Sequence, residues 1–315
     1  MKRLPSIGVT FPASAAVEGL PAFSVRAEML GFDEVWVVED CFFSGGLVMA
    51  ATALAATKEL HVGLGLMPAA IRNPALAAME IGALAWLHPG RFTAVFGHGV
   101  SSWMHQIGAA PSRRLAALGE VTSVVRALLA GETVTLAGDH VTLAGVTLER
   151  PPDIVPQILI GSTGPKGLAL AGRSADGFLV AEGCGPTFVA WAKRQAYDAQ
   201  QAPAHEPHSA AYAWLRIDDD EDEARSVLRP AVDQWLASGL YPEPARACGI
   251  ELPLPPGAVP AGLAKEIAVV GDRMTCARAV RRYAEAGAHR LVLVAVGPEP
   301  DQQYGRFASE VLPLL

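Results

Sequence analysis

Cysteine is scarce in this 315-residue chain, and the few cysteines lie far apart. They are Cys41, Cys184, Cys248 and Cys276, with no Cys-x-x-Cys pair and no histidine at metal-ligand spacing. Disulfide frameworks and zinc sites depend on such paired spacings. The sequence therefore predicts reduced, buried thiols, with neither a disulfide framework nor a bound metal.

Long apolar runs are lacking as well. Stretches such as 47–57 and 291–297 are shorter than the roughly 18–20 residues that a helix needs to cross a bilayer. Near the start of the chain, Pro5, Pro12 and Glu18 interrupt the segment where a secretory signal would carry a continuous apolar stretch. We therefore expect a cytoplasmic protein that makes no contact with a membrane.

Charged residues are few, and acidic ones outnumber basic ones. They make up 18% of the chain, with 32 acidic and 25 basic side chains and a net charge of -7. Binding to the phosphate backbone of nucleic acid requires a basic surface, so we expect no nucleic-acid partner. The hydrophobic fraction of 51% instead favours a compact fold with many fully buried strands.

Short β-branched runs alternate with helical segments along the chain, which is typical of parallel βαβ units. The predicted strands are 7–11, 34–38, 61–66, 91–96, 157–160, 177–180, 210–217 and 290–296. The predicted helices are 22–30, 47–56, 73–86, 112–130, 164–174, 187–199, one from 218 past Leu236, 271–286 and 302–314. Eight such units predict an α/β fold, a (β/α)8 TIM barrel that occupies residues 1–315 as a single domain.

Two insertions interrupt this pattern. Residues 131–148 have turn signals at Gly131 and at Gly138-Asp139 and predict a short hairpin. Residues 239–263 contain six prolines, a density that predicts an irregular loop beside the barrel mouth. No strand is followed by Gly-x-Gly-x-x-Gly or by a Gly-Lys-Ser/Thr phosphate loop, so the sequence lacks the phosphate cradles of Rossmann and P-loop proteins.

Active sites of TIM barrels lie at the carboxyl ends of the strands, so the residues there are the candidates for chemistry. Glu39 and Asp40 follow the second predicted strand and are candidate catalytic carboxylates, although an ordinary solvated pair is an alternative. His98 follows the fourth strand between Gly97 and Gly99. Because imidazole titrates near neutral pH and the glycines give it access, we also take His98 as a candidate catalytic residue.

Two further strand ends indicate binding to a ligand. Gly65, Leu66 and Met67 end the third strand, where a glycine is typical of a bulge or close backbone approach that a flat ring could lie against; a tight barrel corner is the alternative. The second group ends the fifth strand and opens a helix; it consists of Gly161, Ser162, Thr163, Gly164 and Lys166. Small residues at a helix N-terminus leave N–H groups for an anionic phosphate, although an ordinary N-cap would use the same residue types.

Six segments in this order resemble the luciferase-like monooxygenases, including reductases that depend on coenzyme F-420 (F420) and are related to methylene-tetrahydromethanopterin reductase. The segments are 27–40 (AEMLGFDEVWVVED), 63–74 (GLGLMPAAIRNP), 87–99 (LHPGRFTAVFGHG), 128–134 (LLAGETV), 160–180 (IGSTGPKGLALAGRSADGFLV) and 283–298 (YAEAGAHRLVLVAVGP). Each is weak alone, but together they cover most of the chain in the order of the family.

The resemblance implies a luciferase-like barrel with a deazaflavin or FMN in its mouth and a non-prolyl cis peptide bond at Gly65-Leu66 behind the ring. The cofactor-binding residues would be Gly65 to Met67, Gly97 to Gly99, including His98, and the group at 161–166. The family often has an Asp-His pair after the second strand, whereas here Glu39 takes the Asp position and Asp40 the His position. Because an unperturbed Asp is ionised near neutral pH, the catalytic roles cannot simply be transferred.

The resemblance therefore implies an F420-dependent oxidoreductase that transfers a hydride between the deazaflavin and a small organic substrate. An FMN-dependent monooxygenase and a non-catalytic ligand-binding relative are the alternatives. Barrels of this family often pair, so we expect a homodimer. The substrate itself cannot be identified, because its contacts would come from the loops at 101–111 and 239–263.

Overall fold

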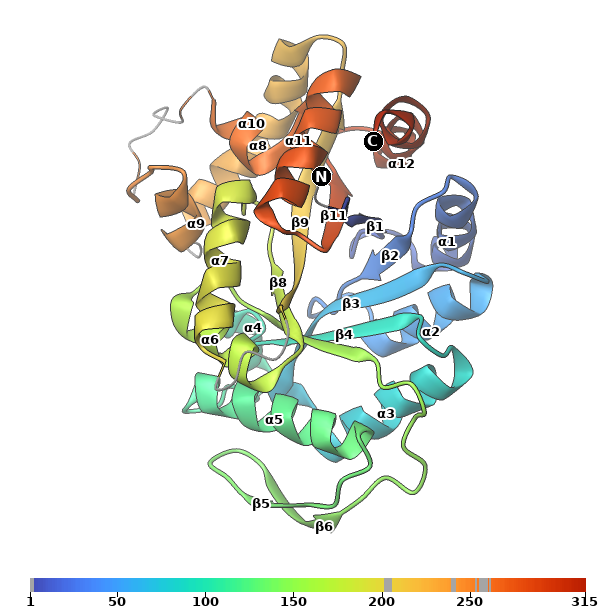
Figure 1. Cartoon of the computed structure of the whole chain (residues 1–315), viewed down its shortest axis with the longest axis vertical. Helices are drawn as coiled ribbons and strands as arrows, with labels where there is room; N and C mark the ends of the chain where they lie inside the picture. The colour runs from blue at the N-terminus through green and yellow to red at the C-terminus, as the bar shows by residue number, and fades with distance from the viewer. Residues whose placement is uncertain (1–2, 201–205, 239–241, 253, 255–259, 261) are drawn as a thin grey trace.

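The computed structural model describes residues 3–200, 206–238, 242–252, 254, 260 and 262–315, and within them eight parallel strands close into a barrel (Figure 1). The barrel strands are β1 (Ser6–Thr10), β2 (Glu34–Val37), β3 (His61–Pro68), β4 (Phe92–Gly97), β7 (Gln157–Gly161), β8 (Gly177–Val180), β9 (His208–Ile217) and β11 (Arg290–Ala295). Pairing of β8 with β9 completes the ring. The predicted (β/α)8 barrel is confirmed.

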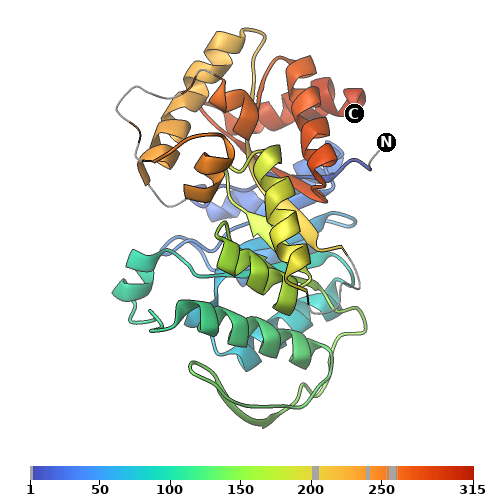
Figure 2. The same ribbon diagram turned by 60° about the vertical axis from the view of Figure 1, so that its left-hand side comes forward.

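Helices surround the barrel on its outer face (Figures 1 and 2). The longer ones are α1 (Leu20–Met29), α2 (Gly46–Ala56), α3 (Pro74–Leu87), α5 (Arg114–Leu129), α6 (Pro165–Ser174), α7 (Pro186–Asp198), α8 (Glu221–Ser238) and α11 (Arg273–Ala286). Local sequence sets several of their ends: Asn73 caps α3 by accepting from the Ala75 amide, and Asp272 caps α11. Gly287 ends α11 in the left-handed conformation that glycine favours. No helix in the described ranges is both long and apolar enough to span a membrane.

The predicted elements at the end of the chain and in the hairpin also form. Residues 131–148 contain the antiparallel pair β5 (Val134–Ala137) and β6 (Thr142–Val146). The predicted closing helix consists of α12 (Pro300–Arg306), followed by a π turn (Phe307–Val311) and a 3-10 turn (Leu312–Leu314). Short 3-10 turns also occur at Val17–Gly19 and Ala69–Ile71.

The structure contains one strand that the sequence pattern did not reveal. β10 (Ala268–Gly271) pairs in parallel with the second half of β9, after β8 has ended beside the first half. Its four apolar residues lie between α10 (Leu263–Ile267) and the cap of α11. A run this short cannot be distinguished by periodicity from the end of a helix, so the prediction omitted it.

The loop predicted at 239–263 is partly wrong. Residues Pro242–Ala247 form α9, which has a proline at its start, where a missing N–H group is tolerated. Residues 239–241, 253, 255–259 and 261 lie outside the described residues. In the loop expected at 101–111, residues Ser101–Gln106 form the short helix α4.

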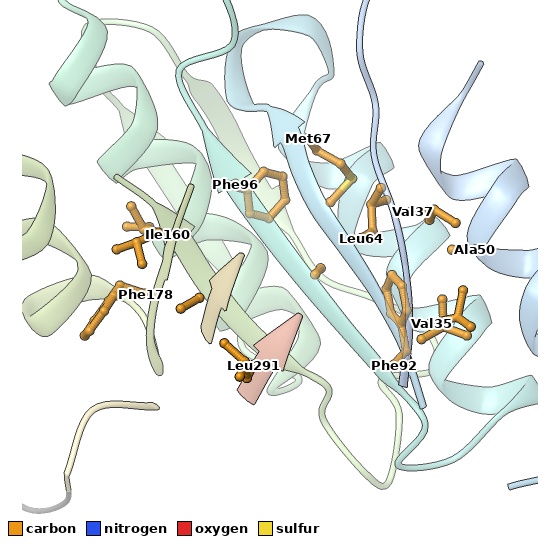
Figure 3. Close-up of a cluster of buried hydrophobic side chains, with 14 of the residues drawn as sticks. Val35, Val37, Ala50, Leu64, Met67, Phe92, Phe96, Ile160, Phe178 and Leu291 are labelled. Carbon is orange, nitrogen blue, oxygen red and sulfur yellow. The ribbon is translucent and has the colours of Figure 1, made fainter. Parts of the chain in front are cut away.

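Alternation along the strands divides the buried side chains between two layers. Figure 3 shows the outer layer, where Val35 and Val37 on β2 and Leu64 on β3 lie near Ala50 of α2. The residues between them point into the barrel instead, and Trp36 is fully buried there. Alternate residues of a strand thus face opposite sides, and we call this alternation the strand parity. It also decides which side chains at the strand ends face the mouth.

Candidate active site

The predicted site residues lie at the ends of neighbouring strands. In the sheet, β2, β3, β4, β7 and β8 follow one another, and all are parallel. Their carboxyl ends therefore form one continuous rim, and Glu39, His98 and Gly161 each lie at or just after one of these ends. The strand ends that the sequence analysis selected for chemistry therefore lie along the same rim of the barrel.

Aromatic rings close the barrel beneath this rim. The Trp36 indole packs against the backbone of Gly63 and Gly8. Only glycine leaves room for it there, since a Cβ atom on Gly63 would lie 2.3 Å from the indole and one on Gly8 would lie 2.9 Å from it. The Tyr212 ring meets Trp36 edge to face, with 5.8 Å between ring centroids. The side chains of Trp36 and Tyr212 therefore fill the interior of the barrel below the rim.

Strand β3 is irregular at the predicted bulge. Its register with β4 shifts between Gly65 and Met67, and the Gly65-Leu66 peptide bond is cis, as the family resemblance implies. The Tyr212 hydroxyl donates a hydrogen bond of 2.9 Å to the Gly65 carbonyl. The bulge is thus held from inside the barrel by a side chain that the sequence analysis did not select.

The bulge directs neighbouring side chains to opposite sides. A Cβ atom on Gly97 or on Gly161 would lie 2.5 Å from Leu66 Cδ2, so both glycines leave room for the Leu66 side chain. Met67 is fully buried in the outer layer near Phe96 (Figure 3). A ligand in the mouth could therefore meet Met67 only through its main chain.

Glu39 is engaged in structural contacts. Both of its carboxylate oxygens accept hydrogen bonds from the Arg72 guanidinium at 2.5 Å, and Oε1 also accepts one from the Gly46 amide at 2.9 Å. Strand parity accounts for this, because Glu39 shares the outward face of Val35 and Val37. The sequence analysis grouped Glu39 with the catalytic residues, but its contacts fit it to hold the start of α2 and the Arg72 loop.

Asp40 has the opposite parity and lies on the side of the barrel interior. Burial raises the pKa of its carboxyl group above the ordinary value. The following Cys41-Phe42 peptide bond is also cis, which the sequence did not predict. Phe42 and Phe43, which follow Asp40 closely in sequence, have largely exposed side chains.

His98 lies where the sequence analysis placed it, after β4 and before Gly99, which has a φ of 66°. Burial and the nearby Arg114 guanidinium both lower the pKa of His98 below its ordinary value. The imidazole is therefore neutral near pH 7. In that state it suits the role of a proton acceptor or hydrogen-bonding group better than that of an acid.

The start of α6 has the features expected of an anion site. Gly164 is its N-cap residue, no side chain caps the helix, and Pro165 is the first helical residue. The Ser162 hydroxyl accepts a hydrogen bond of 3.3 Å from the Gly164 amide and fills the space over Gly167. Amides of the first turn are therefore not covered by a cap, and Lys166 is exposed beside them.

Glu182 is a candidate that the sequence analysis missed. It follows β8 by two residues, and Asp40 follows β2 by three. Burial raises the pKa of Glu182, and the charge of Asp40 raises it further, so the two carboxyl groups are close enough to interact. The rule that selected Asp40, a carboxylate just beyond a strand end, would also have selected Glu182.

Other polar clusters are separate from this rim. A cavity of about 580 Å³ is lined by Arg126, Gln157, Asp176 and His208 among others. Three of these residues lie at or before the amino ends of β7, β8 and β9, so the cavity is at the opposite end of the barrel. Within the described part of the chain, no group of three or more His, Cys, Asp or Glu side chains is placed to hold a metal ion.

Comparisons with known proteins agree with this geometry. A family model described as "Luciferase-like monooxygenase" matches residues 7–290. A 5,10-methylenetetrahydromethanopterin reductase of Methanolobus tindarius is 31% identical over 230 residues, covering 72% of this chain and 70% of the relative. An F420-dependent glucose-6-phosphate dehydrogenase of Intrasporangium calvum is 29% identical and covers 92% of each chain. Among solved structures, an F420-dependent secondary alcohol dehydrogenase in complex with an F420-acetone adduct superposes with a TM-score of 0.80 at 23% identity, covering 98% of each chain.

Proposed function

The chain belongs to the luciferase-like monooxygenase family, and we propose that it is an F420-dependent oxidoreductase that transfers a hydride between this deazaflavin and a small organic substrate. The names of the two relatives point to deazaflavin and pterin chemistry rather than to oxygen insertion. One structural observation supports the proposal most strongly. The β3 bulge, the ends of β4 and β7, which contain Gly97 and Gly161, and the uncapped start of α6 all lie along one rim.

The residues present fit such a cofactor. A planar ring needs a flat apolar surface, and the Leu66 side chain, which lies over Gly97 and Gly161, can provide one next to the Gly65-Leu66 bulge. An anionic tail needs unsatisfied N–H donors, which the first turn of α6 supplies, with Lys166 adding positive charge. We therefore assign ring contact to the bulge and the two strand ends, and phosphate contact to Ser162 through Lys166.

When bound, coenzyme F420 supplies or accepts the hydride, and the protein orients the reacting groups and excludes water. Reduction of a carbonyl or oxidation of an alcohol also moves a proton at the substrate oxygen. Burial favours the protonated form of both Asp40 and Glu182, so this pair can hold that proton where the family often has histidine. His98 would accept a hydrogen bond from the substrate or receive the proton, since its imidazole is neutral.

A purified sample titrated with F420 and, separately, with FMN tests the cofactor assignment. We expect the absorption of F420 to change on binding, and Gly161→Asp to abolish the change, because its side chain would collide with Leu66 and place negative charge on the rim. Gly19→Asp is the matched control: a Cβ atom there meets nothing within 4 Å. Binding of FMN alone with oxygen consumption would favour the monooxygenase, and binding of neither would refute the proposal in favour of a cofactor-free relative.

We also propose that the protein is a homodimer that pairs through α2 and α3. These two helices are apolar on nearly every side, with Glu80 as their sole charged residue, and their exposed faces include Val48, Leu76 and Met79. A surface helix without a polar face is normally covered by other protein. Met79→Glu should yield monomers in sedimentation experiments, whereas Met274→Glu, at an exposed position of α11, should not; dimers in both variants would contradict this.

We regard residues 1–315 as one domain, because the hydrophobic cluster around α8 and β10 shares strand β9 with the barrel. A cytoplasmic location agrees with four free cysteines, since thiols persist in reducing compartments. A net charge of -7 gives no support for a nucleic-acid partner.

A further inference from the structure

A line of buried polar and aromatic contacts starts at the amino end of the barrel. Arg290 Nε donates to Glu34 Oε1 at 2.8 Å, and Trp36 Nε1 donates to Glu34 Oε2 at 2.7 Å. Each oxygen of Glu34 thus binds a different donor, one from β11 and one from β2. Because hydrogen bonds to an ionised group are stronger and more directional than neutral ones, Glu34 fixes the position of the indole ring.

The indole ring has little freedom to move elsewhere. The indole packs directly against the backbone of Gly8 and Gly63, where any side chain would collide with it, and its solvent-exposed fraction is 0%. Its far edge reaches the next layer, because a Cβ atom on Gly65 would lie 2.8 Å from Trp36 Cζ3. The Tyr212 ring rests edge to face on the same indole. Trp36 therefore transmits the position of Glu34 to the layer below the mouth.

Tyr212 completes the connection to the bulge. Its hydroxyl donates to the Gly65 carbonyl, which is 147 residues away in sequence. Burial raises the pKa of this hydroxyl well above its ordinary value, so it stays protonated and remains a donor. The next residue, Leu66, spreads over the ends of β4 and β7. The direction of the Gly65 carbonyl thus sets how the bulge meets the rim.

From these contacts we infer that Tyr212 is a positioning residue for the cofactor: its hydroxyl holds the Gly65 carbonyl, and thereby the bulge, in the orientation that receives the ring. The inference rests on the proposed function, because the bulge is taken as the support for the deazaflavin. The alternative is that Tyr212 is only a packed core residue. In that case its hydroxyl would affect stability and leave cofactor geometry unchanged.

Tyr212→Phe removes the hydroxyl and keeps the ring, and the chain offers a matched control. Tyr304 is also buried; its hydroxyl has the backbone carbonyls of Thr10 and Leu293 within reach of its single proton, at 3.0 and 3.2 Å, and accepts from the Ala295 amide. Tyr304→Phe is therefore the same chemical change away from the bulge. We expect Tyr212→Phe to raise the dissociation constant of F420 about tenfold, to shift the absorption band of bound F420 and to lower kcat more than it changes KM. Tyr304→Phe should lower the stability of the protein and leave the F420 dissociation constant, the absorption band and kcat unchanged.

A second measurement does not depend on the cofactor. Amide hydrogen exchange in the ligand-free protein should become faster at residues 64–68 in Tyr212→Phe and stay at the wild-type rate there in Tyr304→Phe. If Tyr212→Phe does not fold, Trp36→Phe, which removes only the contact to Glu34 and part of the ring surface, should change exchange and binding in the same direction by a smaller factor. Unchanged exchange, spectrum and F420 affinity in a folded Tyr212 variant would overturn the inference. Failure of the wild-type protein to bind F420 would refute the proposed function, and exchange would still decide whether Tyr212 holds the bulge.

Discussion

The two ends of the barrel treat buried charge differently. At the amino end, the buried carboxylate of Glu34 pairs with Arg290 at 2.8 Å. At the carboxyl end, Glu39 is likewise paired with Arg72, but no ion pair within the described residues involves Asp40, Glu182 or His98, although burial shifts the pKa of each. Glu34 at the amino end thus has a charged partner, whereas three titratable groups at the mouth form no ion pair in the described part of the chain.

This difference indicates a division of labour within one fold. A paired buried charge contributes to a rigid base, and its loss is costly because the partner remains behind. An unpaired buried carboxyl group costs free energy of folding but keeps a pKa closer to the range useful for proton transfer. The amino end should therefore respond to mutation mainly in stability, and the mouth mainly in activity.

Glu34→Gln at the amino end should give the largest effect on stability. It leaves Arg290 buried without a counter-charge, and breaking a buried pair in this way costs roughly 3–5 kcal/mol. The free energy of unfolding in urea measures it. Asp222→Asn is the control, since Asp222 pairs with Arg225 on the surface and exposed pairs contribute about 0–1 kcal/mol. Equal losses in the two variants would mean that the amino end has no special role in stability.

Asp40→Asn at the mouth should give the reverse result. We expect turnover to fall by about 100-fold, the range typical for losing a general acid or base, with F420 affinity within about threefold of wild type. Stability at pH 7 should stay the same or rise, because a carboxyl group that is costly to ionise has been removed. Steady-state kinetics and urea unfolding on the same samples test both parts. Full activity in Asp40→Asn would shift the proton-holding role to Glu182 or His98.

The pH dependence of stability should also differ between the two ends. Burial, mainly, lowers the pKa of His61 at the start of β3 to about 3. Between its ordinary pKa of about 6.5 and this value, the unfolded chain binds a proton that the folded chain does not, so stability should fall by about 1.4 kcal/mol per pH unit as the pH falls. His61→Gln should remove this slope, and the same change at exposed His105 should not.

Asp40 at the mouth should contribute a pH dependence of stability with the opposite sign to that of His61. Because burial raises the pKa of Asp40, its contribution to stability is present below the ordinary value of about 4 and is lost as the pH rises through the raised value. Asp40→Asn should therefore remove the loss of stability that accompanies rising pH. His61→Gln should instead remove the loss of stability that accompanies falling pH. Unfolding curves between pH 3 and 7 that change alike in both variants would contradict the assigned pKa directions.

Much of the fold was predictable from the sequence because it follows from local patterns. Alternation of apolar runs with helical segments gave the eight strands, and caps such as Asn73 and Asp272 gave helix starts close to those observed. Strand β10 was missed because four apolar residues between two helices carry no periodicity of their own. The helix α9 was missed because prolines at a helix start resemble prolines in a loop.

The candidate site was predictable in its location and less so in its roles. Strand parity on β2, which separates Glu39 from Asp40, could have been read from the alternation of Val35, Trp36 and Val37. In contrast, the contact between Tyr212 and Gly65 depends on two distant strands meeting in one layer of the barrel. No local pattern encodes such a contact, since packing depends on shapes that only the closed barrel brings together.

The smallest expected effect concerns the exposed charge at the mouth. Lys166→Ala should weaken F420 binding by about threefold at low ionic strength, because an exposed charge beside the first turn of α6 adds only a screened attraction to an anionic group. The effect should disappear near 1 M salt, where the Debye length is about 3 Å. Lys58 is also exposed and lies just before β3 at the amino end, so Lys58→Ala should leave binding unchanged in both conditions. If both lysines alter affinity alike, attraction by the whole protein surface, and not the start of α6, would account for the anion binding.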